Sequence, residues 1–281
     1  MFKVRHLIIL FLLFNPDVSN ATETPRSISW RLHNRITGLP PSPAVHNQMI
    51  SLVESGDLEG AANIAAENPH FYNTRLKNWF KTWGNVDKSP RVPLNDLVAT
   101  LIGIVRDERS FREAIFGDIL YFVKSEDATE DIPVYAPNNN EHFKLIEQNS
   151  YDLKNKLSKV TQSEFNNISD TAGIITTRTY GEAFFNAGTN RRATQYAFIN
   201  FLCHDFSDLH DINISDYLVR RDIDRLPLGD SRIYKNKCVG CHAGPDALGG
   251  AFAYFDYVDG ALVYSNGVVA NKFNKNNLFE E

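Results

Sequence analysis

The sequence is poor in cysteine and methionine and has no excess of basic residues. Only three of its 281 residues are cysteines and only two are methionines. Exported proteins that depend on disulfides usually carry a larger, even set of cysteines, so these three cysteines have another purpose. The formal net charge of −5 excludes the basic surface that binding to a nucleic-acid backbone requires. We therefore expect no nucleic-acid partner.

Long hydrophobic runs are also missing. The run from Leu7 to Phe14 has eight residues, whereas a helix needs about 20 to span a bilayer. Lys3 and Arg5 precede this run, and Ser19-Asn20-Ala21 follows it in the spacing of a cleavage site. We expect residues 1–21 to be a secretory signal peptide and the mature protein to be periplasmic or otherwise exported, with no transmembrane segment.

Apolar residues at helical spacing run through most of the chain. Ser42 and Pro43 are typical of a helix start, and the apolar positions that follow continue to Gly56. Further helices are expected at residues 58–67, 71–83, 94–106, 111–122, 141–159, 181–185 and 191–203. Strand patterns are short, at residues 173–177 and 261–264. The sequence therefore predicts a mainly α, multi-helical fold.

Residues 124–140 differ in composition from the helical regions around them. The segment is acidic at first and then rich in proline and asparagine, which is typical of a loop or linker. We expect it to separate an N-terminal helical region of residues 22–123 from a C-terminal region of residues 141–281.

The sequence Cys238-Val239-Gly240-Cys241-His242 has the spacing of a covalent haem attachment motif. In c-type cytochromes two cysteine sulfurs form thioether bonds with the haem, and the histidine that follows ligates the iron. Two intervening residues let one turn of backbone present both sulfurs to one haem edge. We predict one haem c bound by Cys238 and Cys241, with His242 as the proximal iron ligand, in a cytochrome c-like C-terminal region.

Two other uses of the paired cysteines stay open. They can form a redox dithiol, or they can bind zinc together with Cys203 and His204. Cys203 and His204 are adjacent, whereas zinc ligands are usually separated by about two to four residues. A thioredoxin-like βαβ pattern does not surround Cys238. Export also favours haem, since c-type haem is attached on the exported side of the bacterial membrane.

The sixth iron ligand has no methionine or histidine candidate after the motif, because residues 243–281 contain neither. The upstream candidates are Met49, His204 and His210. Met49 falls on an apolar helix face and can equally be a core residue, and the two histidines can be surface residues after a helix. The other upstream side chains that we consider are His33, His46, His70 and His142, and Lys272, Lys275 or a tyrosine can also serve.

These ligand alternatives separate three functions. A haem with two strong ligands suits electron transfer among exported redox proteins, which we predict. An open sixth position instead suits a haem enzyme or a sensor of peroxide, oxygen or nitric oxide. In the third alternative the haem only completes the core of a structural or binding module. The aromatic residues that follow the motif, which can wall the haem or pack in the core, are Phe252, Tyr254, Phe255 and Tyr257.

The residues after the motif resemble those of the planctomycete-type cytochrome c family. In that family the motif is followed by an Asp-x-x-Gly turn, an aromatic stretch and a Phe-Asp pair before a glycine. Asp246, Gly249, Phe255-Asp256 and Gly260 match this order. Segments 35–43, 106–118, 172–176, 188–192 and 201–203 are also similar to that family. The resemblance implies haem, export and a helical fold, and it implies no substrate.

Overall fold

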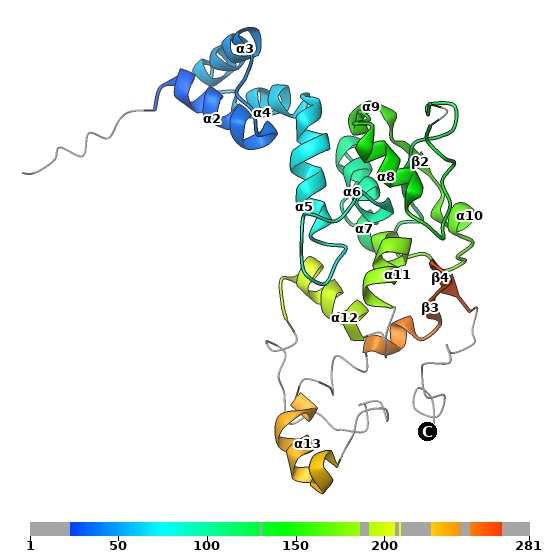
Figure 1. Ribbon diagram of the computed structural model, residues 1–281. Helices are drawn as coiled ribbons and strands as arrows, with labels where there is room; N and C mark the ends of the chain where they lie inside the picture. Colours follow the sequence, from blue (N-terminus) through cyan, green and yellow to red (C-terminus); the bar gives the residue numbers. More distant parts are fainter. Residues whose placement is uncertain are drawn as a thin grey trace, which may run out of the picture. The chain divides into compact units, whose positions relative to one another are not determined.

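The computed structural model describes residues 23–129, 131–185, 191–205, 208, 226–240, 242 and 248–265. The predicted signal peptide, residues 1–21, lies outside the described residues. Most described residues are helical, which confirms the mainly α fold class (Figure 1). The chain divides into two compact units, here called unit 1 (Met1–Asn68) and unit 2 (Pro69–Glu281).

Unit 1 is built from three helices, α2 (Pro25–Thr37), α3 (Pro43–Glu54) and α4 (Leu58–Ala66). Each begins after a residue whose side-chain oxygen accepts a hydrogen bond from a first-turn N–H, and these N-caps are Thr24, Ser42 and Asp57. The predicted starts of α3 and α4 are confirmed. The sequence patterns did not predict α2, because most of its residues are polar.

The core of unit 1 is small. Met49, Ala61 and Ala65 have no exposed surface. The partly buried hydrophobic residues that pack against them are Leu32, Ile36, Val45, Leu52, Val53 and Ile64. The two alanines allow α4 to approach the other helices closely, and Met49 of α3 fills the space between the helices.

Unit 2 contains the remaining described elements. Before residue 150 they are η1 (Phe71–Leu76), α5 (Lys77–Lys81), α6 (Asp96–Arg106), α7 (Glu113–Phe116), β1 (Leu120–Phe122) and α8 (Glu141–Gln148). The next are α9 (Leu153–Lys156), β2 (Ser158–Val160), α10 (Gln162–Asn166), η2 (Gly173–Thr176), α11 (Arg178–Phe184), α12 (Arg191–Ala197) and η3 (Phe198–Leu202). The last are η6 (Pro227–Gly229), α13 (Ser231–Lys237), η7 (Gly249–Phe252), β3 (Phe255–Val258) and β4 (Ala261–Tyr264).

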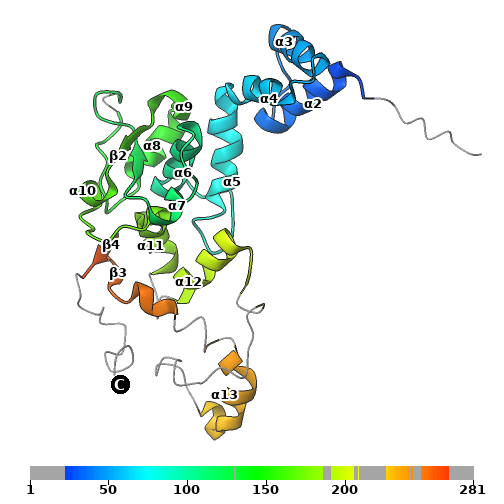
Figure 2. The same ribbon diagram turned by 180° about the vertical axis from the view of Figure 1, so that it is seen from behind.

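Helix α6 lies at the centre of unit 2. All its residues from Asp96 to Ile104 are buried, and α5, α9, α11 and β1 pack around it (Figures 1 and 2). A Cβ atom at Gly103 would overlap the ring of Tyr121 in β1. Glycine therefore lets β1 lie directly against the helix. The helix predicted at residues 94–106 is confirmed.

The strands form two antiparallel pairs. Strand β1 pairs with β2, with Tyr121 opposite Lys159. Strands β3 and β4 form a hairpin in which Tyr257 is opposite Leu262. Strand β4 confirms the strand pattern at residues 261–264.

Three predictions of local structure are wrong. Residues 111–122, expected as one helix, form α7 and then β1, whose three residues are all buried and therefore lack the alternation that marks a strand. The helix predicted at residues 141–159 is interrupted where Ser150 takes a φ of 54°. Gly173–Thr176 forms a 3₁₀ helix rather than the expected strand, and it begins at Gly173 with a φ of 56°.

The domain boundary predicted at residues 124–140 also needs correction. The segment lies inside unit 2, where Ile132 and Tyr135 are buried, and the boundary between the units falls at Asn68 instead. The Tyr135 ring stacks on Phe122 with 4.8 Å between centroids. The pairing of β1 with β2 brings together the parts of the chain that precede and follow the segment. A few apolar residues therefore fold an otherwise polar segment back onto the core.

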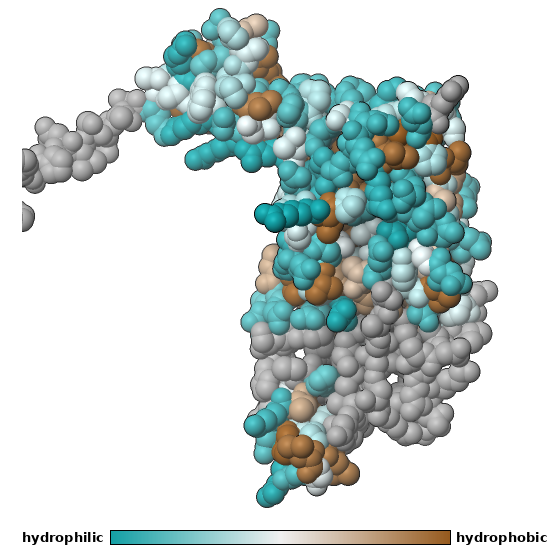
Figure 3. All heavy atoms as spheres, in the orientation of Figure 1, coloured by the Kyte–Doolittle hydropathy of each residue, from teal (hydrophilic) through white to brown (hydrophobic). Residues whose placement is uncertain are grey.

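Among the described residues no helix is both long and apolar enough to cross a membrane. On the face drawn in Figure 3, the hydrophobic residues of the described part form separate patches among hydrophilic ones. Exposed large side chains in unit 2 include Trp79, Phe111 and Phe116.

Candidate functional site

Helix α13 leads directly into the predicted haem motif. The Asp230 carboxylate caps its start by accepting a hydrogen bond from the Arg232 N–H at 2.8 Å. At the other end, the Cys238 N–H donates to the Tyr234 carbonyl at 2.9 Å. The His242 N–H donates in turn to the Cys238 carbonyl at 3.1 Å. One helical turn therefore connects Cys238 with His242.

This turn places the described motif residues at different depths. Val239 is buried, and so is Tyr234 one turn before it. Cys238 is half-buried with a free thiol, and His242 is half-buried. Cys241 lies outside the described residues. Burial of Val239 anchors the turn, while Cys238 and His242 keep part of their surface accessible.

The arrangement fits the donor set of a c-type haem. A thiol and an imidazole four residues apart project from the same side of a helical turn, and they are the attachment group and the iron ligand that such a haem requires. Among the residues that the structure describes, no group of three or more His, Cys, Asp or Glu side chains is placed to hold a metal ion. The zinc alternative stays open, because Cys241 would be one of the ligands.

Cys203 and His204 lie at the end of η3. Cys203 is exposed and takes a left-handed φ of 56°. The His204 ring is also exposed, and its Nδ1 lies 3.7 Å from an Asp208 carboxylate oxygen. His210 lies outside the described residues. His204 as a distal iron ligand stays a prediction, and the structure shows that its ring is accessible.

Other upstream candidates are held within their own surroundings. Met49 has no exposed surface in the core of unit 1. His142 uses both ring nitrogens, because Nε2 accepts from the Val123 N–H at 3.2 Å and Nδ1 donates to the Pro133 carbonyl at 2.7 Å. These environments favour packing and backbone hydrogen bonding over iron ligation for Met49 and His142.

The aromatic residues after the motif join the core of unit 2. The rings of Phe252 and Phe255 lie 5.5 and 6.0 Å from the ring of Phe185. The Tyr254 ring lies 6.1 Å from that of Tyr264. The core-packing alternative is therefore observed for Phe252 and Phe255.

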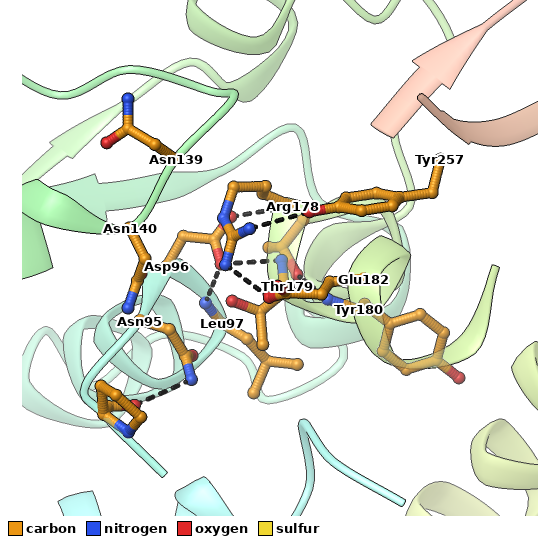
Figure 4. Close-up of polar contacts among 12 residues, drawn as sticks. Asn95, Asp96, Leu97, Asn139, Asn140, Arg178, Thr179, Tyr180, Glu182 and Tyr257 are labelled. Carbon is orange, nitrogen blue, oxygen red and sulfur yellow. Dashed lines mark hydrogen bonds and ion pairs between the residues drawn. The ribbon is translucent and has the colours of Figure 1, made fainter. Parts of the chain in front are cut away.

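Unit 2 contains a buried polar network that no sequence pattern indicates. The carboxylate of Asp96, at the start of α6, is 1% exposed and accepts from the backbone N–H groups of Arg178 at 2.7 Å and Thr179 at 3.1 Å (Figure 4). It also accepts from the Leu97 N–H at 2.9 Å. No local pattern could have indicated this network, because its two helices are about 80 residues apart in the sequence.

The side chain of Arg178 extends the network to the hairpin. One guanidinium nitrogen donates to the Tyr257 hydroxyl at 2.9 Å, and another pairs with Glu182 at 2.7 Å. Burial opposes the charge of Arg178, but the carboxylates of Asp96 and Glu182 outweigh burial and raise its pKa. We call Asp96, Arg178, Thr179, Glu182 and Tyr257 the Asp96 network.

Comparison with known proteins gives no assignment, since no family model, curated protein or solved structure matches the chain. Of the residues that the sequence singled out, the structure brings Cys238 and His242 into one helical turn. It places Met49 in the other unit, in a closed core.

Proposed function

We propose that this protein is an exported c-type cytochrome that carries one covalently bound haem and transfers electrons among exported redox proteins. The observation that carries the proposal is the helical turn from Cys238 to His242, closed by the hydrogen bond of 3.1 Å between their backbones. A turn of this kind supports the proposal, because it brings the Cys238 thiol and the His242 imidazole to one side of the chain.

In this proposal Cys238 and Cys241 hold the haem and His242 ligates its iron. The bound haem supplies a one-electron redox couple. Helix α13 sets the direction of the motif, since the turn continues from its last residues, and buried Val239 fixes the turn. Export belongs to the proposal because haem attachment of this type takes place on the exported side of the membrane, and the basic and apolar start of the chain is typical of a signal peptide.

A haem enzyme or gas sensor is the second candidate function. The absence of methionine and histidine from residues 243–281 favours it, because the sixth position then depends on an upstream residue or stays open. His204 has an exposed ring, and we keep His204 and His210 as candidate distal ligands for the electron carrier.

Covalent haem staining tests the central proposal. The full chain is produced with its own leader in a bacterium that has a c-type haem attachment system, and it is separated on a denaturing gel. We expect the wild type to stain and the double variant Cys238→Ala/Cys241→Ala to lose the stain completely. Cys203→Ala is the matched control and keeps it. Staining of the double variant, or none in the wild type, would overturn the proposal.

Optical spectra with and without carbon monoxide separate the two candidate functions. An electron carrier with two strong ligands gives a low-spin spectrum that carbon monoxide does not change, and His204→Ala or His210→Ala then converts it to high spin. A high-spin wild type that binds carbon monoxide would refute the carrier and support the enzyme or sensor. Met49→Leu is expected to leave the spectrum unchanged, because Met49 is enclosed in unit 1.

A further inference from the structure

A cavity of about 630 Å³ opens beside the Asp96 network in unit 2. Its walls come from residues 84–95, 138–144 and 178–183 and from the turn of the β3–β4 hairpin. Arg178, Thr179, Glu182 and Tyr257 of the network line it, and Figure 4 shows the contacts among these residues. The volume lies within the range of cavities that bind small molecules.

The cavity is held open by contacts that leave little freedom. Asp96 fixes the backbone of Arg178 and Thr179 through two hydrogen bonds. On the opposite wall, the Asn140 side-chain nitrogen donates to the Leu94 carbonyl at 2.8 Å. At the hairpin turn, Gly260 lies so close to the Asn138 carbonyl that a Cβ atom would overlap it. The walls are therefore preorganised by side-chain hydrogen bonds to backbone groups and by one close backbone approach.

Two buried polar atoms in these walls lack partners. The Thr179 hydroxyl and the Asn140 side-chain carbonyl oxygen make no hydrogen bond with any described residue. Thr179 is only 5% exposed. Because a buried polar atom without a partner costs free energy, such atoms often mark positions that a ligand or water satisfies. Both residues line the cavity, so a ligand with hydroxyl groups can supply the missing bonds.

The charges in the walls compensate one another. Arg178 pairs with Glu182 at 2.7 Å, and Lys144 pairs with Glu141 at 2.6 Å. A charged ligand would have to compete with these internal pairs, whereas an uncharged polar ligand would not. The lining thus favours a neutral ligand.

Amides and one aromatic ring supply the remaining chemistry. The side chains of Asn85, Asn95, Asn138, Asn139 and Asn140 line the cavity. Asn85 uses both amide hydrogens and its oxygen on Lys81 and Ser89. The other four amides are only partly engaged by described residues and keep donor or acceptor capacity, which suits adjacent hydroxyl groups. The hydroxyl of half-buried Tyr257 accepts a hydrogen bond from Arg178, which fixes the ring at the cavity wall. An aromatic face can pack against the apolar side of a sugar ring.

We propose that this cavity binds a short neutral saccharide. The Asn amides and the Thr179 hydroxyl bind its hydroxyl groups, and the Tyr257 ring packs against its apolar face. The proposal is independent of haem, since its residues lie outside the haem motif. Tyr257 and Gly260 nevertheless belong to the hairpin that follows the motif, so saccharide and haem would bind to neighbouring parts of one chain.

Binding to an array of immobilised oligosaccharides tests the proposal, with neutral, sulfated and uronic-acid members on the same array. We expect the wild-type protein to be retained by neutral oligosaccharides. Thr179→Val keeps the methyl group of Thr179, which lies beside Gly84, and replaces only the unpartnered hydroxyl. It should therefore fold normally and bind about tenfold more weakly, as expected for about 1.4 kcal/mol from one hydrogen bond.

Tyr257→Ala provides a second variant that does not depend on Thr179, and it should weaken binding at least as much. Thr129→Val is the matched control, because it removes a threonine hydroxyl that bonds Tyr151 outside the cavity. It should leave binding unchanged. Retention by acidic oligosaccharides only, no retention at all, or equal binding by the wild type and both cavity variants would overturn the proposal.

Discussion

The predicted haem motif and the Asp96 network gather their functional groups in two different ways. The motif holds its groups within five consecutive residues, and one backbone hydrogen bond between Cys238 and His242 closes the turn. The network joins α6, α11 and β3. Its Asp96 carboxylate accepts hydrogen bonds from the backbone of Arg178 and Thr179, which follow it by 82 and 83 positions in the sequence. The first arrangement is closed by a local hydrogen bond, whereas the second depends on the complete fold of unit 2.

This difference predicts where substitutions will cost the most stability. Asp96→Ala removes the acceptor of three buried N–H groups and one of the carboxylates that offset the charge of Arg178. We expect a loss of about 3–5 kcal/mol in the free energy of unfolding, because a buried cation and its neighbours lose their partner. Urea unfolding followed by circular dichroism measures the loss.

Asp118→Ala is the control for this substitution. Asp118 also accepts from a backbone N–H, that of Ser163, at 2.7 Å, but its side chain is exposed. Water can replace the lost acceptor there, so the expected change is far smaller. Equal losses for Asp96→Ala and Asp118→Ala would show that the network contributes no more than a surface contact.

The same distinction explains which features the sequence could predict. The start of α3 was predicted correctly because Ser42 and Pro43 act within one turn of the chain. The spacing of Cys238, Cys241 and His242 is also a local pattern, and haem attachment there stays a prediction. The boundary at residues 124–140 was wrong because its composition is polar, while Ile132 and Tyr135 are buried by partners elsewhere in unit 2. Burial of a few side chains outweighed composition.

The candidate cavity was missed for a related reason. Arg178 and Thr179 have no distinctive neighbours in the sequence, and the consecutive asparagines 138–140 look like an ordinary loop. Only packing of α11 against α6 and of the hairpin against Asn138 brings them together. Asp96 gains its role from a tertiary contact, which hydrophobic periodicity does not encode.

A smaller effect is expected from His142, which also depends on long-range packing. Burial lowers the pKa of His142, and the hydrogen bond to the Pro133 carbonyl offsets this only in part. The unfolded chain therefore binds a proton more readily than the folded chain. Stability should be fully present above pH 6.5, the ordinary pKa, and should fall as the pH drops towards the lowered pKa. Urea midpoints at pH 7.5 and pH 5.5 measure the loss.

His142→Asn separates this effect from other titrations. The Asn amide can donate to the Pro133 carbonyl and does not titrate, so its urea midpoint should change less between the two pH values. Glu147 does not interfere, because its two lysine partners outweigh burial and hold its pKa below 4.5. A wild-type midpoint that is the same at both pH values would contradict the prediction.

The smallest effect belongs to a local feature, the left-handed residue Cys203 at the end of η3. A side chain with a φ of 56° is strained, and glycine relieves that strain while losing more entropy on folding. Cys203→Gly should therefore stabilise unit 2 by about 0.5 kcal/mol. Cys203→Ala keeps the Cβ atom and should give no such gain, so comparing the two urea midpoints isolates the backbone effect. A gain for both variants would assign the effect to loss of the thiol, whereas a gain for glycine alone would show that the left-handed backbone at residue 203 causes it.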